Sequence, residues 1–148
     1  MIDIESFTGD HVYLDANVFI YAVEGYEKYS KLCAAILQSI EDMKIHAVTS
    51  ELTLAEVLVH PLRDQKPEVA SIYKDLIQPQ FNLKTPPVTR DVLLRAATLR
   101  ATSTLRLPDA IHIATAQLNN SEFFFTADKS LKVLPPLRVV TLDELLES

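Results

Sequence analysis

Short apolar segments alternate with longer amphipathic segments along almost the whole chain. The short segments are rich in β-branched and aromatic residues, which favour strands, and they cover residues 11–14, 45–48, 81–84, 122–125 and 137–140. The longer segments predict helices over residues 18–23, 28–42, 52–62, 67–77, 90–102 and 108–118. In the segment 90–102, the buried stripe is predicted to contain Leu93, Ala96 and Ala97, with Arg100 at its edge. Strands that alternate with helices predict an α/β domain with a mostly parallel sheet covered on both faces.

The size and composition of the chain fit one soluble domain. No linker or internal repeat divides its 148 residues, so residues 1–148 are predicted to form one domain with a single core. The hydrophobic share of 48% and the charged share of 23% are typical of globular proteins. Cys33 has no second cysteine to pair with, and no apolar run approaches the ~18 residues of a membrane span. We therefore expect a soluble cytoplasmic protein.

The formal net charge of −6 argues at first against a nucleic-acid partner, because phosphate binding favours a basic surface. The distribution of the charge is more informative than its sum. Residues 1–60 contain ten acidic residues and three lysines, whereas residues 84–106 contain four arginines and one lysine against a single acid. A divalent cation held by some of the acids would further reduce the repulsion of a polyanion. The charge therefore does not exclude RNA.

Two acidic residues follow predicted strands closely. Asp15 comes directly after the strand 11–14, and Asp128 follows the strand 122–125 after only two residues. In parallel sheets, ligands bind at the carboxyl ends of the strands, where the strand order reverses. Both acids are therefore expected where such a site would form.

Two further acids interrupt apolar helical segments. Glu56 lies among leucines and valines in SELTLAEVLVH, and Asp109 follows a proline suited to the first helical turn in LPDAIHIATAQL. Taken singly, each of the four acids has an ordinary explanation as a cap, a helix-dipole acid or a solvated side chain. Taken together in one crevice, carboxylates repel one another unless a cation compensates them. Oxygen ligands favour Mg²⁺ or Mn²⁺, and such a site is suited to phosphodiester hydrolysis.

Other kinds of catalytic site find less support in the sequence. The four histidines share no close spacing typical of zinc ligands: His11, His46, His60 and His112. His112 comes three residues after Asp109, and we interpret it as structural rather than as a contact to substrate or water. No serine or cysteine has the flanking glycines of a nucleophile elbow, and the chain has no glycine-rich phosphate loop.

Four motifs occur in order along the chain: YLDANVFIYAVE, TSELTLAEVL, LPDAIHIATAQL and FFFTADKSL. Together they extend over residues 13–131 and resemble the PIN-domain nucleases, particularly the VapC-like ribonuclease toxins of bacterial and archaeal toxin–antitoxin pairs. The resemblance implies a three-layer α/β/α sandwich and a metal-dependent endoribonuclease. It also implies an RNA substrate and a cognate antitoxin protein.

The resemblance implies roles for individual residues as well. Asp15 and Asp109 match direct ligands of Mg²⁺ or Mn²⁺. Glu56 and Asp128 match ligands that bind directly or through water. The polar residues that accompany the first and fourth acids fall on Asn17 and Thr126, with the hydroxyl of Thr126 in an orienting role.

Basic side chains and apolar helical segments are candidates for partner contacts. The basic residues interpreted as phosphate contacts, against an ordinary reading as solvated charges, are Arg90, Arg95, Arg100, Arg106 and Lys129. The segments 18–23 and 52–62 carry more apolar positions than one core face requires. They are candidates for a homodimer or antitoxin surface, against an ordinary reading as core.

Three other functions stay open at this point. A PIN fold that binds RNA or protein without cleavage would use the same elements. A haloacid-dehalogenase-type phosphohydrolase also begins with an apolar strand and Asp-x-Asp, but here Asn17 stands at the second acid. A receiver-type signalling domain needs an acceptor aspartate after a middle strand, where this chain has Thr49 and Ser50.

Overall fold

Five parallel strands form one central sheet in the computed structural model, which describes residues 3–146. The strands are β1 (His11–Leu14), β2 (His46–Val48), β3 (Leu83–Lys84), β4 (Phe123–Thr126) and β5 (Arg138–Thr141), in the order β3-β2-β1-β4-β5. From β1 the chain adds β2 and then β3 on one side; it then returns to the other side of β1, where it adds β4 and then β5. The strand order therefore reverses between β1 and β4, whose carboxyl ends lie side by side.

Helices connect the strands. They are α1 (Ala16–Glu24), α2 (Ser30–Glu41), α3 (Glu51–Arg63), α4 (Pro67–Leu76), α5 (Arg90–Ala101) and α6 (Leu107–Leu118). The predicted strands and helices are all present, with ends shifted by a few residues. The short elements η1 (Ile4–Phe7) and α7 (Leu142–Leu146) were missed, because four or five residues hardly display a helical period. Within residues 3–146, no helix has the length and apolar character needed to cross a membrane.

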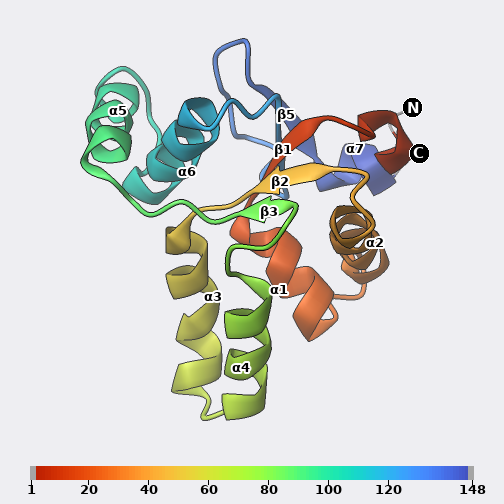
Figure 1. Cartoon of the computed structure of the whole chain (residues 1–148). Coiled ribbons are helices and arrows are strands. Elements are labelled where there is room, and N and C mark those ends of the chain that lie inside the picture. Colours follow the sequence, from red (N-terminus) through yellow and green to blue (C-terminus); the bar gives the residue numbers. More distant parts are fainter. Residues whose placement is uncertain (1–2, 147–148) are drawn as a thin grey trace.

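The sheet separates two apolar layers, because successive side chains of a strand point to opposite faces. Val12 and Leu14 of β1 join the core formed with α1 and α2, whereas Tyr13 joins the opposite core with Ile113 of α6. Figure 1 shows α5 and α6 on one side of the sheet, α1 and α2 on the other, and α3 with α4 extending away from it. The predicted three-layer α/β/α sandwich is confirmed.

The predicted buried stripe of α5 is wrong by one residue. Val92 and Ala96 are buried, whereas Leu93 is 46% exposed and Ala97 faces solvent. The reason is that α5 packs on the small side chains of α6, including Ala110. A narrow contact between two helices buries a different set of positions from the broad stripe that a sheet would cover.

Candidate active site

Asp15 lies at the junction of β1 and α1, where it can be both a helix cap and an acid of the candidate site. Its Oδ1 accepts a hydrogen bond from the backbone N–H of Ala16 at 2.6 Å, which caps α1. Its Oδ2 accepts a second hydrogen bond from Oγ1 of Thr126, at the end of the neighbouring strand β4, at 2.7 Å. The cap therefore fixes the carboxylate at the carboxyl edge of the sheet instead of competing with a role there.

Thr126 links the first acid to the fourth. Its side chain is fully buried, and its Oγ1 accepts a hydrogen bond from the backbone N–H of Asp128 at 3.1 Å. Asp128 in turn accepts hydrogen bonds at Oδ1 from Ser130, from Oγ at 2.6 Å and from the backbone N–H at 2.8 Å. These Ser130 hydrogen bonds lower the pKa of Asp128, since they stabilise its ionised form.

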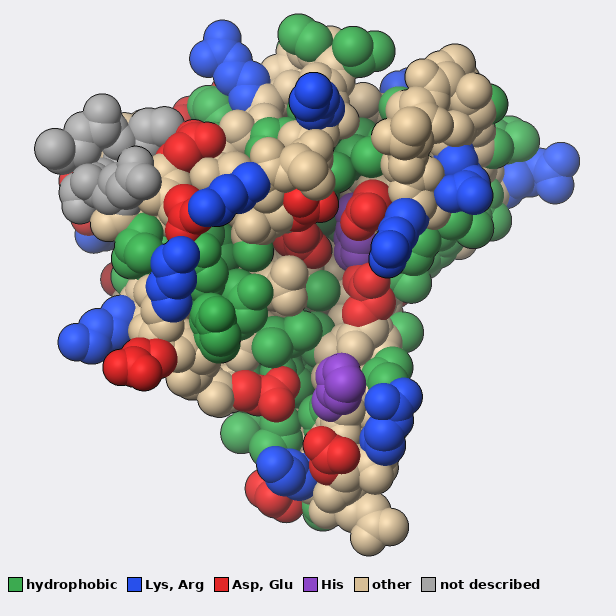
Figure 2. Space-filling view, turned by 180° about the vertical axis from the view of Figure 1, so that it is seen from behind, with side chains coloured by type: hydrophobic (Ala, Val, Ile, Leu, Met, Phe, Trp, Pro, Cys, Tyr) green, Lys and Arg blue, Asp and Glu red, His purple; other side chains and the backbone are tan. Residues whose placement is uncertain are grey.

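Asp109 lies in the first turn of α6, directly after Pro108. Burial raises its pKa, and the charge of Asp15 raises it further, with smaller contributions from Asp128 and Glu56; His112 acts in the opposite direction. A carboxylate at a helix N-terminus is normally stabilised by the helix dipole, which lowers its pKa. At Asp109 the effects of burial and of like charges on the pKa are larger. Asp109 is therefore close enough to the other three acids predicted from the sequence to be affected by their charge. Figure 2 shows acidic side chains gathered near a histidine in the middle of the face hidden in Figure 1, with basic side chains beside them.

Glu56 reaches across from α3 to α6. Its Oε1 lies 2.6 Å from Nε2 of His112, whose side chain is only 3% exposed. Nδ1 of the same ring lies 2.5 Å from the hydroxyl of Tyr13, which accepts a hydrogen bond from the backbone N–H of Ser50 at 3.1 Å. Glu56 was expected in the site from the sequence, whereas Tyr13 and Ser50 were not. Only the three-residue spacing between Asp109 and His112 hinted at this network.

The remaining predicted residues are distributed unevenly around the crevice. Asn17 follows Asp15 by two residues in the first turn of α1. Arg106 is the N-cap residue of α6, and Arg100 donates a hydrogen bond to the carbonyl of Leu105 at 3.0 Å, so both lie near the turn that precedes Asp109. Arg90 is exposed at the start of α5.

Two predicted basic residues have partners away from the carboxylates. Lys129 pairs with Asp143 of α7 at 2.5 Å. Arg95 donates a hydrogen bond to Gln117 at 3.2 Å and lines a cavity with residues 120–123 and 134–138, at the amino ends of β4 and β5. The structure therefore places Arg95 at the edge of the sheet opposite to Asp15.

The four acids fit a hard divalent cation by donor type and by charge. All of them are carboxylates, and three of them raise the pKa of the fourth, which indicates excess negative charge in the crevice. Their side chains do not form a closed cage: within residues 3–146, no three His, Cys, Asp or Glu side chains are arranged to hold a metal ion.

The fold and these acids define an α/β domain with acidic side chains at the switch point of a parallel sheet. The family model of the PIN domain matches residues 12–135. The chain therefore belongs to the PIN domain family, as its motifs indicated, and neither the phosphohydrolase nor the receiver interpretation is supported by this match. Comparison with curated proteins finds no significant match.

Three solved bacterial structures have a similar fold, and they include a toxin–antitoxin complex and a toxin. A toxin–antitoxin complex from Klebsiella pneumoniae contains a chain that is 26% identical, with a TM-score of 0.64 over 88% of this chain and 97% of that one. VapBC2 from Rickettsia felis, bound to a promoter DNA fragment, gives 16% identity and a TM-score of 0.64 over 88% and 98%. The sarcin–ricin loop cleaving toxin VapC20 from Mycobacterium tuberculosis gives 15% identity and a TM-score of 0.67 over 84% and 99%.

Proposed function

We propose that this chain is a divalent-metal-dependent endoribonuclease and the toxin of a toxin–antitoxin pair. The observation that carries the proposal is the placement of Asp109 near three other carboxylates, which raise its pKa, beside the adjacent carboxyl ends of β1 and β4. Two similar structures support the biological class: one is a toxin–antitoxin complex, and another is described as cleaving the sarcin–ricin loop. RNA is accordingly the substrate class, and Mg²⁺ or Mn²⁺ the cofactor.

The four carboxylates would hold the cation, and the chain itself sets their positions. When bound, the cation would supply an activated water and neutralise charge that develops on the scissile phosphate. Thr126 and the N–H of Ala16 hold both oxygens of Asp15, which limits rotation of that carboxylate. Ser130 holds Asp128 in the ionised form. Asp109 has the most to gain from a cation, because burial and three neighbouring charges disfavour its ionised form.

Arginines at the turn between α5 and α6 are the best-placed candidates for phosphate contacts. Arg106 and Arg100 are both exposed, and they lie at the same end of this helix pair as Asp109. Their positive charge would offset the repulsion between RNA phosphates and the carboxylates. Lys129 would contribute only if its ion pair with Asp143 opened.

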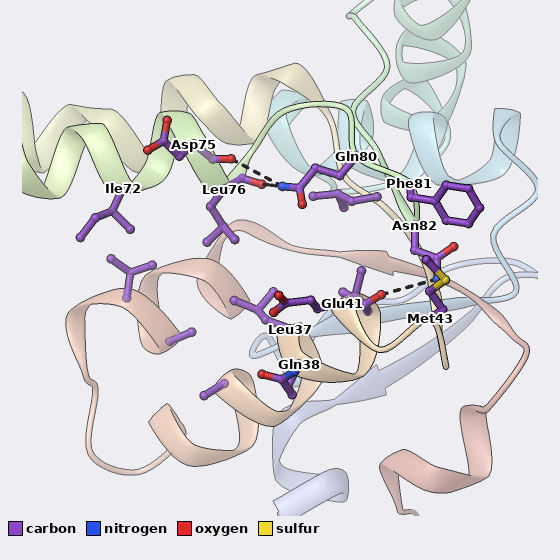
Figure 3. Close-up of a pocket in the computed structure, with 15 residues that line it drawn as sticks. Leu37, Gln38, Glu41, Met43, Ile72, Asp75, Leu76, Gln80, Phe81 and Asn82 are labelled. Atoms are coloured by element: carbon purple, nitrogen blue, oxygen red, sulfur yellow. Dashed lines mark hydrogen bonds between the residues drawn. The ribbon is translucent and has the colours of Figure 1, made fainter.

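An apolar groove is the feature of the structure that supports a protein partner, the proposed antitoxin. It has a volume of about 630 Å³ and lies between α1, α2, α4 and the segment before β3. Figure 3 shows Ile72, Leu76 and Leu37 facing this groove, with Phe81 beside it. Phe81 is 86% exposed. Glu41 and Asp75 also line the groove, so we propose as its occupant an antitoxin segment with apolar side chains and flanking Lys or Arg.

The antitoxin proposal is tested by co-expressing this chain with each short protein encoded by a neighbouring reading frame and measuring co-purification. Ile72→Asp should abolish co-purification, whereas Leu94→Asp, at an exposed apolar position of α5, should not. Equal loss in both variants would argue against the groove. The expected homodimer stays a prediction, which light scattering of the purified chain would check.

Catalysis is tested by incubating a small-RNA pool with purified protein and Mg²⁺ or Mn²⁺, with a chelator as control. We expect discrete fragments that require metal and disappear in Asp15→Asn and Asp109→Asn. The matched variant Asp91→Asn removes an exposed acid in the first turn of α5 and should cleave like the wild type. Metal-dependent RNA binding without fragments would instead indicate a binding module.

A further inference from the structure

A buried chain of hydrogen bonds ends on one of the proposed metal ligands. It starts at the backbone N–H of Ser50, passes through the hydroxyl of Tyr13 and the ring of His112, and ends on Oε1 of Glu56. The successive distances are 3.1, 2.5 and 2.6 Å. Tyr13 comes from β1, Glu56 from α3 and His112 from α6, so the network connects three separate elements beside the candidate acids.

The partners of each atom fix the direction of this network. Tyr13 is fully buried and stacks on Phe124, with ring centroids 4.9 Å apart, so its hydroxyl has little freedom to move. Its oxygen already accepts from Ser50, and a phenol is protonated at neutral pH, so we assign its O–H as the donor to Nδ1 of His112, which lies 2.5 Å away. The neutral imidazole then carries its hydrogen on Nε2, which donates to Glu56; we assign this tautomer from the partners.

We infer that His112 is a positioning residue, which holds Glu56 against α6 so that its second oxygen, Oε2, is available to a cation. Glu56 is 34% exposed and would be hydrated by water without this contact, so its own solvation does not require a buried ring. The contact instead fixes a flexible carboxylate beside the helix that carries Asp109, one turn before His112. This inference rests on the proposed metal-dependent function.

Two substitutions separate the halves of the network. The amide nitrogen of glutamine, a donor, lies as many bonds from Cβ as Nε2 of histidine, and the amide oxygen of asparagine, an acceptor, as many as Nδ1. His112→Gln therefore preserves a donor for Glu56, whereas His112→Asn preserves only a partner for Tyr13. His60→Asn changes an exposed histidine on α3 and is the matched control.

The measurement is the Mn²⁺ affinity of RNA-free protein, followed by electron paramagnetic resonance of the free ion. We expect His112→Asn to bind Mn²⁺ roughly 10–100-fold more weakly, the range typical for groups that orient metal ligands. His112→Gln should retain most of the affinity, and His60→Asn all of it. Thermal melting establishes that each variant is folded. If His112→Asn does not fold, Tyr13→Phe replaces it, since loss of the hydroxyl frees the imidazole and should also weaken Mn²⁺ binding.

The outcomes distinguish this inference from the proposed function. Wild-type protein that binds no Mn²⁺ and cleaves no RNA would overturn both. Wild-type binding that is matched by His112→Asn, or by Tyr13→Phe where that variant is used, would overturn the positioning role alone. Equal losses in His112→Gln and His112→Asn would also overturn it, because a donor to Glu56 would then not be the relevant feature.

Discussion

Replacing Thr126 by valine removes one hydroxyl and leaves the shape of the side chain almost unchanged. That hydroxyl donates to Oδ2 of Asp15 at 2.7 Å and accepts from the backbone N–H of Asp128 at 3.1 Å. Both hydrogen bonds would be lost in Thr126→Val. The variant therefore tests whether the link between β1 and β4 matters for stability and for the site.

The expected cost follows from the two hydrogen bonds. A hydrogen bond to an ionised group contributes about 1.5–3 kcal/mol, and a neutral one about 0.5–1.5 kcal/mol. Because Asp128 is exposed, water can replace the partner of its N–H, and we take the lower part of the sum, about 2–3 kcal/mol. For a chain of this size the melting temperature should fall by roughly 4–12 °C. Thr126→Ser keeps the hydroxyl and loses one buried methyl, which should cost only about 1 kcal/mol.

Thermal melting and RNA cleavage of the two variants check this reasoning. We expect Thr126→Val to melt below Thr126→Ser and to lose about tenfold or more in metal-dependent cleavage, because Asp15 would no longer be oriented. Thr126→Ser should cleave nearly as well as the wild type. A valine variant that melts and cleaves like the serine variant would refute the argument.

Three further predictions concern charge. Asp109→Asn should raise the melting temperature of the metal-free protein at pH 7, because burial and Asp15 raise the pKa of Asp109; ionisation therefore costs stability as the pH rises through this pKa. The gain should vanish below pH ~4, where the carboxyl is neutral in both states, and equal melting at pH 7 would contradict it. Asp143→Asn should lower the melting temperature at pH 7, because Lys129 lowers the pKa of Asp143 and so stabilises the folded protein with an ionised Asp143. The difference in melting temperature should become smaller at high salt and as the pH falls toward ~3. A difference that does not depend on salt would exclude the ion pair as its cause. Arg106→Glu should weaken RNA binding and reduce the dependence of the binding constant on salt concentration by about one phosphate contact. Arg95→Glu should change neither quantity, and equal effects of the two substitutions would contradict the different placement of the two arginines.

The fold, and the places of the four candidate acids within it, were predictable because both depend on local sequence. Short β-branched and aromatic segments before Asp15 and Asp128 mark strands, and a carboxyl end of a strand follows directly from where its segment stops. Glu56 stood out because an acid inside an apolar helical segment needs a polar neighbour. Parallel pairing then brings such ends together, since every strand of a parallel sheet ends at the same edge.

The partners of these acids were not predictable in the same way. Contact between His112 and Glu56 joins residues 56 positions apart, and it depends on where the fold places α3 relative to α6. The pair of Lys129 with Asp143 depends on α7, which is too short to be recognised by its period. Arg95 lies about one and a half turns before Arg100 on α5. This distance along the helix is enough to place Arg95 near the amino ends of the strands instead of their carboxyl ends.

The acids differ in how the protein supports their charge, and this difference says where a cation should act. Asp15 and Asp128 receive hydrogen bonds from nearby N–H and O–H donors, which stabilise a carboxylate without any metal. Asp109 has burial and like charges instead, and its pKa rises. A bound cation should therefore stabilise the ionised form of Asp109 more than that of Asp15 or Asp128. At a pH where the carboxyl of Asp109 is still protonated, binding of the cation should release that proton. Mn²⁺ affinity should accordingly rise with pH in the acidic range in wild-type protein and lose this part of its pH dependence in Asp109→Asn.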